Sequence, residues 1–263
     1  MYLNAALKAT ATHSSVRIQA YADDILVWSL LDSDGGVSHL QDGLNDVVRT
    51  LDELGLKLSP NKCLAMTLQK RVQACDCPLF INDAQVKETT VIKYLGLLID
   101  QRLKWKFQIL DVSGRAFNRL TGLQRMVKKL SGLSPALTHS IVKRSIEPLM
   151  YYGAAIWGSK QSALQHLKAL DKVIRRCGIT TSSAVRTCSY PSVYRLAGLR
   201  PSHIEISDVI LKYGSRLAKL GKSSLDCRGW TSNTSSPLET ALQNEVRRIQ
   251  RKRKTEDLLR SRL

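Results

Sequence analysis

The sequence lacks the features that mark membrane, secreted and zinc-binding proteins. No apolar run approaches the roughly 18 to 20 residues that a helix needs to cross a bilayer. Residues 1–15 have one lysine and no sustained apolar stretch, so they do not resemble a signal peptide. The cysteines form no pair of C-x-x-C knuckles and no Cys/His array with zinc spacing. We therefore expect an intracellular protein with no membrane partner and with reduced cysteines. The cysteines are Cys63, Cys75, Cys77, Cys177, Cys188 and Cys227.

Acidic residues are scarce in the second part of the chain. Residues 1–110 contain 12 Lys and Arg against 12 Asp and Glu, whereas residues 111–263 contain 28 against 10. The whole net charge of +18 therefore comes from the second part. Such an asymmetry predicts a polyanionic partner, for which nucleic acid is the natural candidate. The alternative is a basic surface that only keeps the protein soluble.

Hydrophobic patterning in the first part is typical of strands mixed with one helix. Apolar residues at helical spacing predict a helix over residues 37–54, and Gly55 stands where a helix usually ends. The polar residues Tyr21-Ala22-Asp23-Asp24 lie between two strand patterns, where a hairpin would turn. The expected strands cover residues 16–20, 25–28, 63–68, 79–86 (as a hairpin) and 91–99 (as one strand).

After Trp105 the apolar residues recur at intervals of three or four, which predicts helices. Residues 107–221 should thus form a basic helical domain, followed by a polar linker and basic tail over residues 222–263. The nearly all-basic run 247–254 fits a nuclear localisation signal, a nucleic-acid-binding arm or a solvated tail. The expected helices cover residues 109–130, 135–148 (kinked or ended by Pro148), 164–177 (closed by Gly178) and 206–220.

The paired carboxylates Asp23 and Asp24 are the strongest candidates for a chemical role. Phosphoryl transfer with two Mg²⁺ ions needs carboxylates that hold the ions about 3.5–4 Å apart. Magnesium prefers oxygen ligands and keeps some of its waters. A hairpin tip between two buried strands would hold such carboxylates rigidly and leave them open to solvent. The alternative is an Asp-rich surface turn, since aspartate favours turns.

Several blocks, in the same order along the chain, resemble the reverse transcriptases of non-LTR (LINE-like) retrotransposons of the Jockey or I type. Ala20-Tyr21-Ala22-Asp23-Asp24-Ile25 resembles the active-site hairpin of that family. Residues 55–63 are similar to the next block, and residues 93–100 are similar to the primer-grip block. Residues 152–158 and 190–206 resemble later blocks. The resemblance covers about residues 1–210.

This resemblance implies a fold and an activity. The fold would be α+β, with a partial polymerase palm over residues 1–106 (the Tyr-Ala-Asp-Asp hairpin, a helix and antiparallel strands). An all-α thumb-like domain would follow over residues 107–221. The implied activity is RNA-directed DNA polymerase, with an RNA template, a DNA primer and deoxynucleoside triphosphates as partners and Mg²⁺ as cofactor.

The resemblance also implies roles for individual residues. Asp23 would be the main metal ligand, and Asp24 would support the same site. Lys62 would protonate the leaving pyrophosphate as a general acid, although a surface lysine after a turn is an equal alternative. Tyr94, Leu95 and Gly96 would position the primer end, and a core strand with a tightly packed glycine is compatible with that role. These three residues form the predicted primer grip.

The basic residues of the helical domain would contact the phosphates of the template–primer duplex. Such contacts carry little base specificity. The alternative is a solvated helix face without a partner. The candidates are Arg115, Arg119, Arg125, Lys128 and Lys129 on one predicted helix, and Lys168, Lys172, Arg175 and Arg176 on another.

The sequence also departs from the family pattern. The family has a third carboxylate on an earlier strand, together with a fingers subdomain, but the first acidic residue here is Asp23. We therefore expect an incomplete two-metal site and a fragment that is inactive alone. The rival interpretation is a non-enzymatic, nucleic-acid-binding remnant of a decayed retroelement, and a third is a remnant without function.

Overall fold

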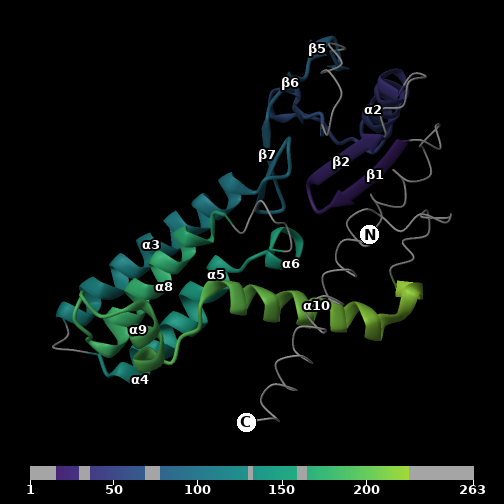
Figure 1. The fold of residues 1–263 in the computed structure, drawn as a ribbon. Helices are drawn as coiled ribbons and strands as arrows, with labels where there is room; N and C mark the ends of the chain where they lie inside the picture. The colour runs from purple at the N-terminus through teal and green to yellow at the C-terminus, as the bar shows by residue number, and fades with distance from the viewer. Residues whose placement is uncertain (1–15, 30–35, 69–77, 130–132, 159–164, 225–263) are drawn as a thin grey trace. The chain divides into compact units, whose positions relative to one another are not determined.

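The computed structural model describes residues 16–29, 36–68, 78–129, 133–158 and 165–224. The chain divides into two compact units, Met1–Leu103 and Lys104–Leu263, which we call the N-terminal unit and the C-terminal unit. Figure 1 shows strands with one long helix in the first unit and helices in the second. The predicted mixture of helix and strand is confirmed.

The N-terminal unit begins with a β-hairpin that packs against a helix (Figure 1). Strand β1 (Val16–Tyr21) pairs antiparallel with β2 (Asp24–Ser29). Alternate residues of the hairpin share one face, and that face meets Val47 and Leu51 of α2 (Gly36–Glu53) in a hydrophobic core. The helix approaches closely at Gly43, where an added Cβ would lie 2.7 Å from Val16 Cγ1.

Helix α2 ends as its sequence predicts. Gly55 has a φ of +70°, a conformation that glycine adopts without steric cost. The Leu56 amide then donates to the carbonyl of Leu51 at 2.8 Å and closes the last turn. A second face of α2 contributes Val48 to a small core with Ile81 and Val86.

The described strands of the N-terminal unit form four two-stranded sheets. The predicted hairpin over residues 79–86 is confirmed, with Asn82 and Asp83 at positive φ in its two-residue loop. The single strand predicted over residues 91–99 is wrong, because Leu95 and Gly96 also adopt positive φ and reverse the chain into a hairpin. The remaining elements are η1 (Pro60–Lys62), β3 (Leu64–Ala65), β4 (Phe80–Ile81), β5 (Ala84–Gln85), β6 (Lys87–Glu88), β7 (Val91–Tyr94) and β8 (Leu97–Asp100).

The C-terminal unit is built around two long helices that pack together, α3 (Lys106–Lys129) and α8 (Leu167–Ser182) (Figure 1). The predicted apolar face of α3 is buried: Ile109, Val112, Ala116 and Leu120 have no exposed surface. Helix α9 (Tyr190–Ala197) packs on α8, and α10 (Ser202–Ser224) packs on α8 and α6 (Ala154–Trp157).

Pro148 disturbs its helix, as predicted. Helix α4 (Pro135–Ile141) starts at Ser134, whose side chain accepts a hydrogen bond from the Leu137 amide at 3.2 Å. The chain then widens into a π-helical turn, η2 (Val142–Ile146), and continues as α5 (Glu147–Met150). Proline cannot donate to the preceding turn and its ring crowds the backbone there, so a widened turn is the expected accommodation.

The predicted end of the next helix at Gly178 is wrong. Helix α8 continues through Gly178 to Ser182, and Ser183 then adopts a φ of +55°. Gly178 instead allows α9 to approach, because an added Cβ would lie 2.5 Å from Val193 Cγ1. Close packing, rather than helix termination, explains this glycine.

Four further observations bear on expectations from the sequence. None of the helices that the structure describes is long and apolar enough to cross a membrane. Cys63, Cys177 and Cys188 are free thiols. Helix α10 reaches Ser224 and so extends past the predicted boundary at residue 221. The basic run 247–254, with most of the predicted linker and tail, lies outside the described residues.

Candidate active site and nucleic-acid interface

Asp23 and Asp24 stand at the tip of the β1–β2 hairpin. Tyr21 and Asp24 are the last paired residues, so Ala22 and Asp23 form a two-residue loop. Both aspartates are exposed, and Tyr21 is 63% exposed. Ala22 has a φ of +54° at the loop position where a type II′ turn favours glycine. The tip therefore presents two adjacent carboxylates to solvent on a backbone held in an uncommon conformation.

The hairpin below the tip is anchored firmly. Val16 and Ile18 are buried against α2, and Ala20, Ile25 and Val27 pack on the same core. This apolar face fixes the register of the two strands, because a slip by one residue would turn it to solvent. The position of Asp23 and Asp24 thus follows from the packing of hairpin residues one to eight positions away.

A second hairpin tip comes close to the carboxylates. Tyr94 ends β7, and the pKa of its phenol is raised, first by burial and then by the negative charge of Asp24. Its hydroxyl is buried and has no hydrogen-bond partner among the described residues. Leu95 and Gly96, both half-buried, make the two-residue loop that follows. The structure therefore brings the first residue of the predicted primer grip within electrostatic reach of the predicted metal site.

Comparison with known proteins points to one family. Residues 1–99 match the family model "Reverse transcriptase (RNA-dependent DNA polymerase)". This match contains both hairpins just described, with Asp23, Asp24 and Tyr94. The resemblance to non-LTR retrotransposon reverse transcriptases is confirmed.

The similar proteins are polymerases of mobile elements. The chain is 25% identical over 60% of its length to a protein named "Probable RNA-directed DNA polymerase from transposon X-element" of Drosophila melanogaster, covering 18% of that protein. It is 24% identical over 77% of its length to "Probable RNA-directed DNA polymerase from transposon BS" of the same species, covering 22%. It is 25% identical over 61% of its length to "RNA-directed DNA polymerase from mobile element jockey" of Drosophila funebris, covering 18%. The chain thus spans about a fifth of these relatives. No solved structure matches it.

The carboxylates of the β1–β2 hairpin suit a hard divalent cation. They are exposed oxygen ligands on a fixed turn, and Mg²⁺ is commonly bound by one or two carboxylates with waters completing its shell. Within the described ranges, no group of three or more His, Cys, Asp or Glu side chains could hold a metal ion. The two aspartates therefore fit part of a metal site.

Lys62 ends the short turn η1 and its side chain is exposed. In the described part of the chain, no hydrogen bond or ion pair links Lys62 to Asp23 or Asp24. The side chain of the predicted general acid, Lys62, is thus open to solvent, and no described contact links it to the two aspartates.

Two of the basic residues of α3 that were predicted to contact phosphates bind other residues of the chain instead. Arg115 forms an ion pair with Asp111, and Arg119 donates to the carbonyl of Ser145 at 3.0 Å, which ties α3 to η2. Arg125 is exposed. The side chains of Lys128 and Lys129 lie outside the described residues.

The basic residues of α8 divide into two groups. Arg176 lies over the ring of Phe117 at 5.0 Å, and Arg175 donates to the carbonyls of Arg186 and Cys188 at 2.6 and 2.9 Å. These two arginines therefore brace the helices and a loop. Lys168 and Lys172 are exposed on the same helix. Arg125, Lys168 and Lys172 are exposed and make none of these contacts, so they are the stronger candidates for phosphate contacts.

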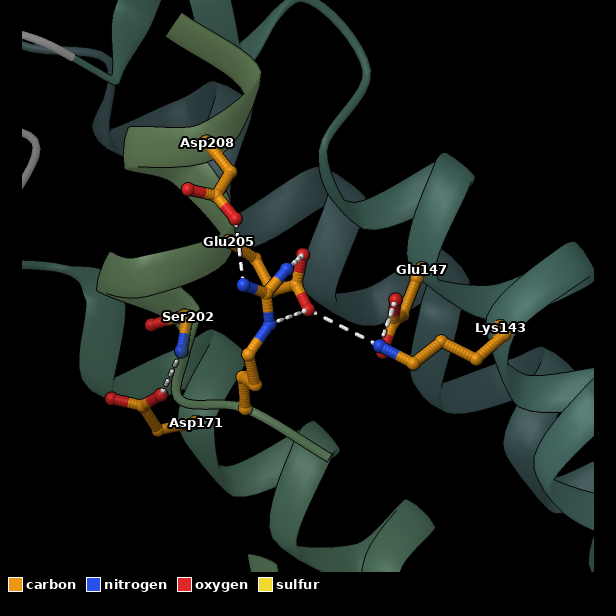
Figure 2. Close-up of polar contacts among 7 residues, drawn as sticks. Lys143, Glu147, Asp171, Ser202, Glu205 and Asp208 are labelled. Atoms are coloured by element: carbon orange, nitrogen blue, oxygen red, sulfur yellow. Dashed lines mark hydrogen bonds and ion pairs between the residues drawn. The ribbon is translucent and has the colours of Figure 1, made fainter. Parts of the chain in front are cut away.

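The C-terminal unit also contains an ionic network that the sequence analysis did not identify (Figure 2). Lys143 of η2 contacts Glu147 at 2.9 Å and Glu205 of α10 at 3.1 Å. Arg200 reaches Glu205 through two nitrogens, each at 2.9 Å, and Asp208 at 2.6 Å. The network joins segments about sixty residues apart in the sequence. Only the Lys143–Glu147 pair, with its spacing of four residues on a helix, gave a local signal.

The two glutamates of this network titrate differently. Burial raises the pKa of Glu147, although Lys143 opposes that shift. Burial would also raise the pKa of Glu205, but hydrogen bonds from Arg200 and Lys143 lower it on balance. The surroundings thus favour the charged form of Glu205 more than that of Glu147.

Proposed function

We propose that the chain is part of the RNA-directed DNA polymerase of a non-LTR retrotransposon. In this proposal the N-terminal unit is a partial palm and the C-terminal unit is a thumb-like domain that holds template and primer. The observation that carries it is the exposed Asp23–Asp24 tip with Tyr94 beside it, inside the region that matches the reverse transcriptase family.

Each residue of the site would have a separate role. Asp23 and Asp24 would hold divalent metal, which when bound supplies charge neutralisation for a transferring phosphoryl group. The Tyr94 hydroxyl has no hydrogen-bond partner among the described residues, so it would be available to donate one. The loop of Leu95 and Gly96 would place the primer end against that hydroxyl. Lys62 would serve as a general acid once a substrate draws it in.

Metal binding gives a direct test of the carboxylate pair. Mn²⁺ in place of Mg²⁺ can be titrated into the full chain and its bound fraction read from the electron paramagnetic resonance signal. Asp23→Asn should abolish the tightest bound fraction, because it removes one of two adjacent anionic ligands. Asp83→Asn is the matched control, since Asp83 is an exposed aspartate in the two-residue loop of another hairpin. Equal loss in both variants would contradict a specific site.

We further propose that these 263 residues do not polymerise DNA by themselves. Two carboxylates at one tip cannot readily clamp two divalent ions, and the described residues offer no third. A primer-extension assay on an RNA template with Mg²⁺ should give no product above the level of Asp23→Asn. Mg²⁺-dependent synthesis that Asp23→Asn abolishes would overturn the proposed inactivity while supporting the site.

A second candidate function is nucleic-acid binding without synthesis. Residues 104–263 contain 30 Lys and Arg against 10 Asp and Glu, which favours it. The two candidates separate in one experiment: binding of an RNA–DNA heteroduplex that is equally tight with and without Mg²⁺, and unchanged by Asp23→Asn, supports the second.

A further inference from the structure

A hollow of about 360 Å³ lies on the C-terminal unit, between α8, α9 and the start of α10. Its volume is at the small end of the range for sites that bind small molecules. Helix α8 contributes Lys168, Asp171 and Lys172, helix α9 contributes Tyr190 and Tyr194, and α10 contributes His203. The lining therefore combines cations with aromatic rings.

The charge offered by the hollow is positive. Lys168 and Lys172 are exposed and stand one turn apart on α8. Asp171 lies between them, but its carboxylate already accepts a hydrogen bond from the Ser202 amide at 3.0 Å (Figure 2). That bond directs the carboxylate toward the start of α10. The hollow thus suits an anionic ligand.

The aromatic side of the hollow is held in place by several contacts. Arg175 holds the carbonyls of Arg186 and Cys188, just before α9 begins, and its guanidinium lies 4.8 Å from the centre of the Tyr190 ring. Tyr190 and Tyr194 meet edge to face with ring centres 6.1 Å apart. Tyr190 is nevertheless 43% exposed. A ring that is fixed in orientation and still exposed can stack against a base.

The hydroxyl of Tyr194 lacks a partner. It is buried and makes no hydrogen bond among the residues that the structure describes. Burial, with the nearby charge of Asp171, raises the pKa of Tyr194, so the hydroxyl stays protonated at neutral pH. An unpaired buried donor is costly, and a ligand that accepts from it would remove that cost.

We propose that this hollow binds one nucleotide of a single-stranded nucleic acid. Lys168 and Lys172 would contact its phosphate, Tyr190 would stack on its base, and Tyr194 would donate a hydrogen bond to it. A paired base cannot reach a ring in this way, so the site selects single strand over duplex. The inference rests on the proposed binding of nucleic acid by the C-terminal unit. It shares Lys168 and Lys172 with the proposed duplex contacts and adds base recognition by Tyr190 and Tyr194.

The test uses the full chain and fluorescein-labelled probes: oligo-U, oligo-dT and an RNA–DNA heteroduplex, each followed by anisotropy. Tyr190→Ala should weaken binding of both single strands by about 5- to 150-fold, the range for loss of one stacked base. Heteroduplex binding should be unchanged. Tyr213→Ala is the matched control, because Tyr213 is 40% exposed and does not line the hollow.

Tyr194→Phe guards against misfolding as an explanation. It removes an unpaired buried hydroxyl, so the melting temperature should stay the same or rise while single-strand binding weakens. A greater loss for oligo-U than for oligo-dT would assign RNA as the ligand, and an equal loss would assign either strand. If both tyrosine variants bind single strands like the unchanged chain, the hollow is not a nucleotide site. If no probe binds at all, the proposed nucleic-acid function fails as well.

Discussion

The two units of the molecule differ in where their stability and their chemistry lie. Residues 1–103 carry 10 Lys and Arg against 12 Asp and Glu, whereas residues 104–263 carry 30 against 10. Among the large side chains that the structure describes as fully buried, Val47 alone belongs to the N-terminal unit. The candidate catalytic tip therefore stands on a small core, and the basic surface stands on a well-packed one.

This contrast suggests that the N-terminal unit (the hairpin unit below) is held together by a few close contacts. The C-terminal unit (the helical unit below) has many. A two-stranded sheet is marginal alone and needs a helix or further strands against it. Here α2 supplies that support through Val47 and Leu51. Free thiols allow each unit to be followed separately: burial raises the pKa of Cys177 in the C-terminal unit to about 12, so it should resist alkylation until that unit unfolds.

The largest expected effect comes from the core of the helical unit. Trp157 has no exposed surface, and its indole nitrogen donates to the Tyr152 carbonyl at 2.9 Å. Trp157→Ala should lower the free energy of unfolding by about 3–5 kcal/mol. Urea titration with pulsed alkylation of Cys177 measures this change in the free energy of unfolding. Phe107→Ala is the control, since Phe107 is 50% exposed on α3 and its loss should cost little. Similar costs for both would mean that the helical core is loosely packed.

A smaller effect is expected from the ionic network. Glu205→Gln should cost roughly 2 kcal/mol at neutral pH, because charged hydrogen bonds from Lys143 and Arg200 are lost while both cations keep another partner and partial exposure. The lowered pKa of Glu205 means that its contribution is present above the ordinary value of 4.5 and is lost as the pH falls through the lowered pKa. The cost of the variant should therefore vanish in acid.

A comparison with the Glu147→Gln variant makes the test of the ionic network more specific. Its pKa is raised, so its contribution favours the folded state at low pH and is lost as the pH rises through the raised pKa. Glu147→Gln should then cost less at neutral pH than Glu205→Gln. The measurement is urea unfolding of both variants over a series of pH values. A greater cost for Glu147→Gln at neutral pH would contradict this description of the network.

A matched pair of glycines compares the units directly. Gly43→Ala should destabilise the hairpin unit by about 1–2 kcal/mol, because the new Cβ would meet Val16 at 2.7 Å. Gly122→Ala on α3 should stabilise the helical unit by about 0.5–1 kcal/mol, because open space surrounds that position. Urea unfolding with alkylation of Cys63 and Cys177 assigns each change to its unit. A gain of stability in Gly43→Ala would refute the packing described for α2.

The smallest expected effect lies at the candidate catalytic tip. Ala22 has a positive φ that glycine would adopt more easily, so Ala22→Gly should stabilise the hairpin by at most about 1 kcal/mol. Hydrogen exchange of the β1 and β2 amides would report it. Slower exchange supports the strained turn, and faster exchange would mean that the alanine is well accommodated.

Local patterns predicted much of this fold. The strand alternation around Tyr21-Ala22-Asp23-Asp24 and the helical spacing of α3 were sufficient to place both elements. The errors came where a short local signal had two meanings. Gly178 was predicted to end a helix, but its lack of a side chain allows close packing with Val193. The apolar run that includes β7 was predicted as one strand, but the chain turns at Leu95. The Glu205 network was missed because its link from Lys143 to Glu205 spans 62 residues and forms only in the folded chain.

The salt dependence of heteroduplex binding tests most directly the claim that the helical unit binds nucleic acid. Six neutralised phosphates would give a log–log slope of roughly −5 for the full chain. Changing Arg125, Lys168 and Lys172 to Gln should flatten the slope by about one per lost contact. The matched change of the exposed Arg49, Lys87 and Arg102 in the hairpin unit should leave it unaltered. A slope near zero, or equal flattening by both sets, would contradict the account.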